Sequence, residues 1–232
     1  MQCPVGMYQR IANVFREVAM EEFQVYTDIA SRTNGEIYLG VCGPVRTGKS
    51  TFIKRFMELL VLPAITNEHD RQRAVDELPQ SADGKTIMTT EPKFIPKEAV
   101  GVRLMGDNEV RMRLIDCVGY IVDGANGLTE DGEERMVMTP WSKEPMPFTQ
   151  AAEFGTQKVI HDHSTVGVVV TTDGSFGELE RGVYLEAEER TIRELKEIGK
   201  AFVVLVNSIH PYSEETINVV QEIRDKYDVE VM

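Results

Sequence analysis

The sequence predicts an α/β domain of three layers, with helices on both faces of a mostly parallel sheet that includes one antiparallel strand. Three observations predict this fold. The apolar run at residues 37–42 is followed at once by a glycine-rich turn and by a helical pattern from Lys49 or Ser50. Two apolar segments flank Gly106-Asp107-Asn108, as in a β-hairpin. Helix and strand patterns then alternate to the end of the chain, as in parallel sheets.

The first half of the chain carries the least regular elements. Residues 7–32 place apolar side chains at helical spacing before Asn34-Gly35, which predicts one or two helices. Residues 61–97 contain several prolines and many polar residues, which indicates a long surface segment with a short helix near 69–78. The hairpin then supplies two strands, at 100–105 and 110–116, and places one antiparallel strand beside the first strand.

The second half repeats helix and strand. Its predicted elements are an irregular stretch at 118–147, helices at 149–161, 184–198 and 213–227, strands at 166–171 and 202–207, and a last strand barely begun at 229–231. We therefore expect a helical extension at 1–34 and a single domain at 35–232 that is truncated at its last strand.

Composition excludes several classes of function. The formal net charge is −13, which disfavours nucleic acid and anionic lipid as direct partners, because both need clustered Lys and Arg. No apolar run approaches the roughly 20 residues of a membrane-spanning helix, and the first residues lack the apolar segment of a signal peptide. Three cysteines form no even disulfide framework, so we expect a reduced, cytoplasmic setting.

Residues 43–50 match the phosphate-loop pattern GxxxxGK[ST] in full. In such a loop, glycines let backbone N–H groups surround a β-phosphate at a helix N-terminus, the lysine reaches the β- and γ-phosphates, and the serine ligates Mg²⁺. The residues expected to bind nucleotide are Gly43, Pro44, Val45, Arg46, Thr47, Gly48, Lys49, Ser50, Thr51, Gly119 and Asn207.

Two further segments fit a nucleotide site of the GTPase-like (TRAFAC) class of P-loop NTPases. Asp116 and Gly119 form a DxxG motif after a strand, which would set the carboxylate near Mg²⁺ and a backbone N–H at the γ-phosphate. The long loop between the motifs contains Thr86, Thr89 and Thr90, and we favour the last two as residues that sense the γ-phosphate, with Thr90 completing the Mg²⁺ ligands. The expected catalytic residues are Lys49, Asp116, Thr89, Thr90 and Arg46.

The base-reading motif is incomplete. Guanine sites in this class use NKxD after the next strand, whereas this chain keeps Asn207 but has Ser208 and His210 in place of the lysine and aspartate. Without the carboxylate, discrimination in favour of guanine should largely vanish, so ATP becomes the expected nucleotide. Tyr120 replaces the glutamine that orients attacking water, which predicts slow intrinsic hydrolysis. Arg46 either assists at the phosphates, in cis or across a subunit contact, or is a solvated loop arginine.

Three segments resemble the ATPase domain of the stage IV sporulation protein A family of endospore-forming bacteria: IYLGVCGPVRTGKSTFIKRFMELLVLP, DELPQSADGKTIMTTEPKFIP and RLIDCVGY. The likeness is nearly continuous from about Met20 to the end of the chain. By matching motif, the resemblance makes Lys49 the phosphate-loop lysine, Asp116 the acid associated with Mg²⁺, and Thr89 with Thr90 the sensor threonines. It also implies an ATP-using site that lacks the guanine motif.

The resemblance implies a biological role as well. In that family, ATP hydrolysis drives self-assembly of the protein into the basement layer of the spore coat, on the outer surface of the forespore in the mother-cell cytoplasm. The implied partners are further copies of the chain, other spore coat proteins and, for indirect membrane anchoring, stage V sporulation protein M. Residues 1–19 are expected to be an extension upstream of the family's usual start, and the family's middle and C-terminal domains are absent from this chain.

Two other classes of function stay open on the sequence. A regulatory switch would prefer GTP, and a structural scaffold would bind nucleotide without turnover, as Tyr120 allows. Relative affinity for ATP and GTP decides the first alternative, and turnover that depends on Lys49 excludes the second.

Overall fold

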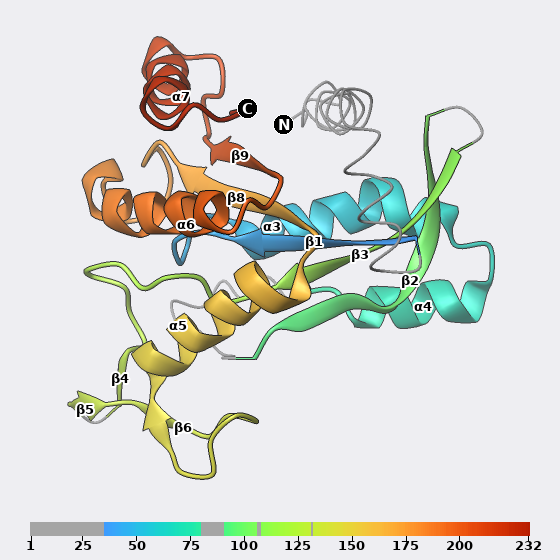
Figure 1. Cartoon of the computed structure of the whole chain (residues 1–232), viewed down its shortest axis with the longest axis horizontal. Coiled ribbons are helices and arrows are strands. Elements are labelled where there is room, and N and C mark those ends of the chain that lie inside the picture. The colour runs from blue at the N-terminus through green and yellow to red at the C-terminus, as the bar shows by residue number, and fades with distance from the viewer. Residues whose placement is uncertain (1–34, 80–90, 106–107, 131) are drawn as a thin grey trace.

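The computed structural model describes residues 35–79, 91–105, 108–130 and 132–232 (Figure 1). The predicted helices at 7–32 and the threonines Thr86, Thr89 and Thr90 lie outside these ranges, so their predictions stay as expectations.

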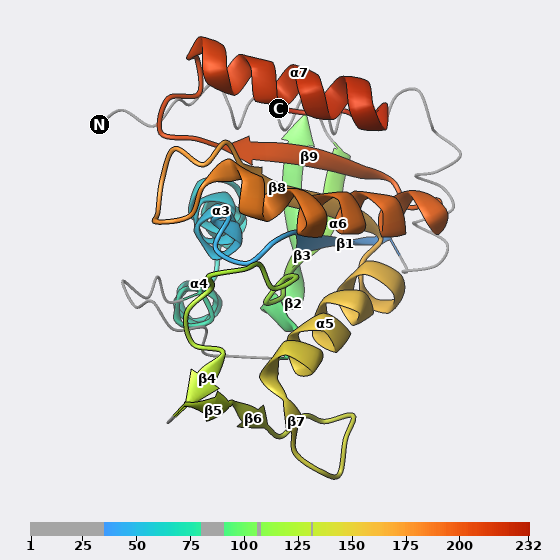
Figure 2. The ribbon, with the colours of Figure 1, turned by 90° about the vertical axis from the view of Figure 1, so that its left-hand side faces the viewer.

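A five-stranded sheet forms the centre of the molecule (Figures 1 and 2). Its strands in spatial order are β2 (Lys93–Met105), β3 (Asn108–Asp116), β1 (Glu36–Cys42), β8 (Val166–Thr172) and β9 (Phe202–Asn207). All neighbours are parallel except β2 and β3, which are antiparallel. The prediction of a mostly parallel sheet with one antiparallel strand is confirmed, but β2 pairs with β3 and not with the first strand.

The helices cover both faces of this sheet. Their bounds are α3 (Lys49–Phe56), α4 (Glu68–Asp76), α5 (Phe148–Lys158), α6 (Leu185–Glu197) and α7 (Glu214–Tyr227), with π-helical turns η1 (Met57–Val61) and η3 (Val159–His163) and 3-10 turns η2 (Leu62–Ala64) and η4 (Arg181–Tyr184). Two apolar cores result, since alternate strand residues point to opposite faces. One core joins the sheet to α3 and α4, and the other joins it to η3, α6 and α7.

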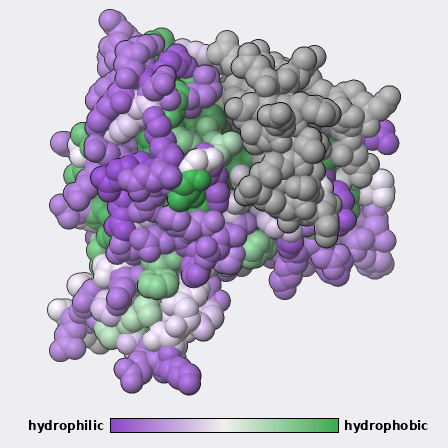
Figure 3. All heavy atoms as spheres, in the orientation of Figure 1, coloured by the Kyte–Doolittle hydropathy of each residue, from purple (hydrophilic) through white to green (hydrophobic). Residues whose placement is uncertain are grey.

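Two predictions about irregular segments are wrong in part. Strand β2 begins at Lys93, seven residues earlier than expected, because Pro96 lies on an edge strand where no partner needs its missing N–H. The stretch at 118–147 contains two short hairpins, β4 (Thr129–Glu130) with β5 (Glu133–Glu134) and β6 (Met136–Val137) with β7 (Met146–Pro147). They form a projecting lobe on which Figure 3 shows hydrophobic side chains beside hydrophilic ones.

At 229–231, where a strand was predicted, the structure has an isolated bridge beside β9. Val231 forms a parallel bridge with Val204 of β9, and the Met232 N–H donates to the Val204 carbonyl at 2.9 Å. Within the ranges that the structure describes, no helix combines the length and apolar character needed to cross a membrane.

Candidate functional site

The glycine-rich loop lies at the carboxyl end of β1 and leads directly into α3. Gly43 has φ of 120°, and a Cβ there would lie 2.5 Å from the Val170 carbonyl oxygen of β8. Gly48 has φ of 94°, and a Cβ there would collide with the side-chain amide of Asn207. Both positions need glycine, because a side chain would be strained by the backbone angle and blocked by its neighbour.

Lys49 is the first residue of α3 and is only 5% exposed. Its Nζ donates to the Pro44 carbonyl at 2.5 Å and reaches the Gly43 carbonyl at 3.5 Å. Burial lowers the pKa of the Lys49 ammonium, and the nearby Cys117 and Asp116 oppose that change. The turn of the loop therefore encloses a positive charge that its own backbone carbonyls neutralise only in part.

Ser50 and Asp116 meet beside this lysine although they are 66 positions apart. The Ser50 hydroxyl donates to Asp116 Oδ2 at 3.1 Å. The other carboxylate oxygen, Oδ1, is buried and has no hydrogen-bond partner among the described residues. Burial raises the pKa of Asp116, while the charge of Lys49 lowers it. A hydroxyl next to a carboxylate oxygen with free lone pairs is a ligand set that suits Mg²⁺.

Asn207 ties the last strand of the sheet to the same loop. It ends β9, and its Nδ2 donates to the Thr47 carbonyl at 3.0 Å. The Thr47 side chain is fully buried, and its hydroxyl donates to the Pro44 carbonyl at 3.0 Å. Asn207 thus stabilises the conformation of the glycine-rich loop through this hydrogen bond. Thr51, the remaining loop residue expected to bind nucleotide, is exposed on α3.

The residues after Asn207 are held by a polar network that the sequence did not predict. Asp173 Oδ2 accepts from the Thr216 hydroxyl at 2.7 Å, and the Ser208 hydroxyl lies 3.1 Å from that of Thr216. Burial raises the pKa of the Asp173 carboxyl, but hydrogen bonds from Ser175, Ser208 and Thr216 outweigh burial and lower the pKa. This network orders the turn in which Ser208 and His210 replace the expected lysine and aspartate.

Gly119 is the glycine of the DxxG motif, and its role at a γ-phosphate stays a prediction. In this structure its backbone N–H donates to the Thr156 hydroxyl of α5 at 3.1 Å. The next residue pairs with the glycine-rich loop: the Tyr120 N–H donates to the Gly43 carbonyl at 3.2 Å, and the Val45 N–H donates to the Tyr120 carbonyl at 2.9 Å. The DxxG segment is therefore bonded on one side to the loop and on the other to α5.

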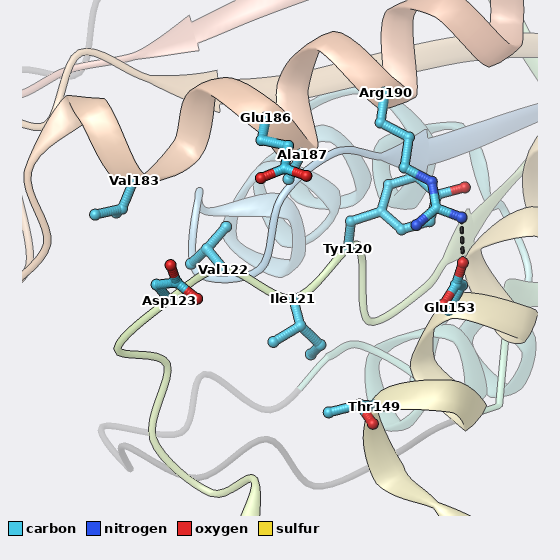
Figure 4. A pocket seen from close by; sticks show the side chains of 10 residues that line it. All are labelled: Tyr120, Ile121, Val122, Asp123, Thr149, Glu153, Val183, Glu186, Ala187 and Arg190. Carbon is cyan, nitrogen blue, oxygen red and sulfur yellow. Dashed lines mark hydrogen bonds and ion pairs between the residues drawn. The ribbon is translucent and has the colours of Figure 1, made fainter.

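The Tyr120 side chain is anchored to α6. Its hydroxyl donates to Glu194 Oε2 at 2.5 Å, and the Arg190 guanidinium lies 4.2 Å above its ring. Arg190 also pairs with Glu153 of α5 (Figure 4). Burial, with the hydrogen bond to Glu194 adding to it, raises the pKa of the Tyr120 phenol. No sequence motif marked Glu153, Arg190 or Glu194, because these residues meet only when the two helices pack.

A cavity of about 220 Å³ adjoins this network (Figure 4). It lies between residues 120–123, the start of α5 and the start of α6, and its polar lining includes Asp123, Glu153, Glu186 and Arg190. It borders the segment that follows DxxG and not the cradle of the glycine-rich loop.

Arg46 lies in the middle of the glycine-rich loop with φ of 64°, in the left-handed region that few residues other than glycine adopt. Burial raises the pKa of Tyr184 in η4, and the positive charge of Arg46 lowers it. The structure brings Arg46, Lys49, Ser50, Asp116 and Gly119 to one edge of the sheet. Thr89 and Thr90 lie outside the described residues.

This edge, with its glycine-rich turn, buried lysine and paired serine and aspartate, defines a mixed α/β domain compatible with an ATPase. The chain belongs to the stage IV sporulation protein A family, since the model of that family's ATPase domain matches residues 20–232.

Stage IV sporulation protein A of Bacillus subtilis (strain 168) is 59% identical over 213 residues, which are 92% of this chain and 43% of that protein. The protein of the same name from Bacillus anthracis is 57% identical over 92% of this chain and 43% of its own length. That of Clostridioides difficile (strain 630) is 54% identical over 90% of this chain and 42% of its own length. The chain thus spans less than half the length of these curated relatives.

Proposed function

We propose that this chain is a P-loop domain of the GTPase-like (TRAFAC) type that binds ATP with Mg²⁺ and hydrolyses it to ADP and phosphate. One observation carries the proposal: the glycine-rich loop between β1 and α3 brings Lys49, Ser50 and Asp116 together, with one Asp116 oxygen buried and unpartnered among the described residues. Membership in a family whose domain is named an ATPase supports the same conclusion.

The proposed roles follow from the contacts. The Lys49 ammonium, now shared between two backbone carbonyls, would exchange them for phosphate oxygens, which carry more negative charge. The loop from Gly43 to Ser50 and the start of α3 would direct N–H groups at the β-phosphate. Asn207 would hold the loop in shape, since its amide grips the Thr47 carbonyl. Thr89, from outside the described residues, would sense the γ-phosphate.

Ser50, Asp116 and Thr90 would hold Mg²⁺, which when bound neutralises charge on the phosphates. The first two fit this role, because Ser50 offers a hydroxyl oxygen and Asp116 offers Oδ1 without giving up any hydrogen bond in the described structure. Burial raises the pKa of Asp116 and the charge of Lys49 lowers it, so a bound cation would further favour the ionised carboxylate.

The selectivity for ATP follows from the base-reading turn. Ser208, in the position of the lysine, uses its hydroxyl within the network to Thr216 and to the His210 N–H, at 2.9 Å from the latter. None of the three residues after Asn207 supplies a carboxylate to a guanine edge. The loss of that acceptor removes the main source of preference for GTP.

The larger role that we propose is assembly. Hydrolysis of ATP would drive self-association of the protein into the basement layer of the spore coat, on the forespore surface in the mother-cell cytoplasm. Further copies of the chain, other coat proteins and stage V sporulation protein M would be the partners. Two features support this proposal: membership in the sporulation family, and an acidic composition that favours indirect anchoring to a membrane over direct contact.

The first test is release of phosphate from ATP and from GTP in the presence of Mg²⁺. We expect turnover of ATP in preference to GTP, with Lys49→Ala and Asp116→Ala each losing at least about 100-fold in rate, because each removes charge stabilisation at the phosphates. A preference for GTP would overturn the assignment of the base site. Turnover retained in the Lys49→Ala variant would overturn the assignment of the phosphate site.

Arg46 requires a separate test. If its guanidinium reaches the transferred phosphate, Arg46→Ala should lower the rate of hydrolysis while the affinity for ADP is kept. Arg55→Ala is a matched control, since that arginine is exposed on α3 and pairs only with Glu58 in the described structure. Equal rates for the two variants would leave Arg46 as a solvated loop residue.

A further inference from the structure

Gly119 lies directly against the glycine-rich loop. It has φ of 95°, and a Cβ added to it would collide with the Gly43 carbonyl oxygen and lie 2.5 Å from Lys49 Nζ. The residue thus covers the lysine that is proposed to contact the β- and γ-phosphates. We call residues 117–120, which include it, the closing segment.

Two sets of hydrogen bonds hold the closing segment in this place. On the loop side, Tyr120 exchanges backbone hydrogen bonds with Gly43 and Val45. On the opposite side, the Gly119 N–H donates to Thr156 Oγ1 at 3.1 Å. The Tyr120 hydroxyl also bonds the segment to Glu194, but the Gly119 N–H itself donates to Thr156, so the Thr156 hydroxyl is the group that holds this N–H.

Thr156 is itself fixed. It lies in α5, its side chain is fully buried, and its hydroxyl donates to the Ala152 carbonyl one turn earlier at 2.8 Å. Because the proton of the hydroxyl is directed at that carbonyl, a lone pair is left to accept from Gly119. Because the Thr156 hydroxyl bonds both Ala152 and Gly119, its orientation is fixed, and the oxygen that accepts from Gly119 stays in one place.

We propose that Thr156 is a positioning residue that holds the Gly119 N–H away from the nucleotide and thereby sets the affinity for ATP relative to ADP. This inference rests on the proposed function, together with the expectation from the DxxG motif that the Gly119 N–H donates to the γ-phosphate of bound ATP. ATP must then break the hydrogen bond between Gly119 and Thr156, whereas ADP has no γ-phosphate to draw on that N–H. The hydroxyl therefore lowers the affinity for ATP and leaves the affinity for ADP unchanged.

The effect of removing the hydroxyl follows from the two states. In the state without ATP, which we call the closed state, the Gly119 N–H is bonded to Thr156. Thr156→Val leaves this buried N–H without an acceptor, which destabilises the closed state. In the ATP-bound state the Gly119 N–H donates to the phosphate, so it does not need Thr156. The bond from Thr156 to the Ala152 carbonyl is lost from the variant in both states, so its loss does not change the ratio of affinities. The ratio of the dissociation constants, Kd(ADP)/Kd(ATP), should rise about five- to a hundredfold, the range expected for one unsatisfied buried donor.

The experiment measures the affinities of Mg²⁺-ATP and Mg²⁺-ADP by calorimetry for the parent and three variants. Thr156→Val removes the acceptor, and Thr156→Ser keeps it. Thr191→Val is the matched control, because Thr191 is equally buried in α6 and its hydroxyl likewise donates to the carbonyl of Ala187, one turn earlier, at 2.7 Å. Thermal unfolding of each variant reports whether the fold is kept.

We expect a raised ratio in Thr156→Val alone, with Thr156→Ser and Thr191→Val at the parental ratio. An unchanged ratio in a folded Thr156→Val, while the parent binds both nucleotides, would overturn this inference and leave the proposed function standing. A ratio raised equally in Thr191→Val would overturn it as well, since general loosening of the helices would then be the cause. A parent that binds neither nucleotide would overturn the proposed function itself.

Discussion

A buried ion pair beside the site offers the sharpest test of the packing. Arg181 of η4 contacts Glu188 of α6 through two hydrogen bonds, at 2.5 and 2.8 Å, and the Thr171 hydroxyl at the end of β8 donates to the same carboxylate at 2.5 Å. The Glu188 side chain is 1% exposed. Replacing Arg181 by methionine therefore leaves a carboxylate shielded from water with one hydroxyl donor, that of Thr171, among the residues that the structure describes.

The Arg181→Met variant should lose about 3–5 kcal/mol of unfolding free energy, the cost of stranding one partner of a buried pair. The double variant Arg181→Met/Glu188→Leu should recover most of this loss, because it leaves no unpaired charge. Urea denaturation followed by circular dichroism measures both values.

An exposed ion pair serves as the control that distinguishes the effect of burial from the effect of pairing. Lys158 and Asp162 approach to 2.6 Å, but their side chains are 40% and 51% exposed. Lys158→Met should cost less than about 1 kcal/mol, because water solvates the remaining carboxylate. The reasoning fails if Arg181→Met costs no more than Lys158→Met, or if the double variant is as unstable as the single one.

Three further outcomes are expected. Burial raises the pKa of Asp116 above its ordinary 3.8, so the unfolded chain loses that proton first and the unfolding free energy falls as pH rises between the two values. Asp116→Asn should therefore be more stable than the parent at pH 7, with the two urea curves converging below pH 3.8. Gly43→Ala should lower the free energy of unfolding, measured in urea, by about 1–3 kcal/mol more than Gly177→Ala does. Both glycines have positive φ, but an added Cβ at Gly43 would meet the Val170 carbonyl oxygen, whereas one at Gly177 has nothing within 4 Å. Asn207→Ala should weaken binding of ATP about tenfold by calorimetry, since it removes a hydrogen bond of the glycine-rich loop; unchanged affinity would contradict a supporting role.

Most strands and helices of the described chain could be predicted from apolar periodicity. The patterns at 166–171 and 202–207 became β8 and β9 with bounds changed by at most one residue, because a strand buried on both faces reads as an apolar run. The start of β2 could not be predicted in this way. In the sequence, Pro96 indicates a loop. A strand can include it because β2 lies at the edge of the sheet, which the sequence does not show.

The candidate site divides along a similar line. Lys49 and Ser50 follow from one contiguous motif, and the position of Asp116 follows from its place at the end of a strand. Thr156 could not be found, since a helical threonine with no motif gains its role only when α5 packs beside residue 119. The network of Tyr120 with Arg190 on α6 is hidden for the same reason.

The sequence by itself determined the order of elements, the glycine-rich turn and the residues that follow each strand, because backbone sterics and side-chain periodicity act over a few neighbouring residues. The tertiary structure alone decided which of these groups meet. It placed the Asn207 amide on the Thr47 carbonyl and the Gly119 N–H on the Thr156 hydroxyl. Such contacts join positions far apart in the chain, and a buried polar group takes whichever partner the packing of the sheet and helices brings within reach.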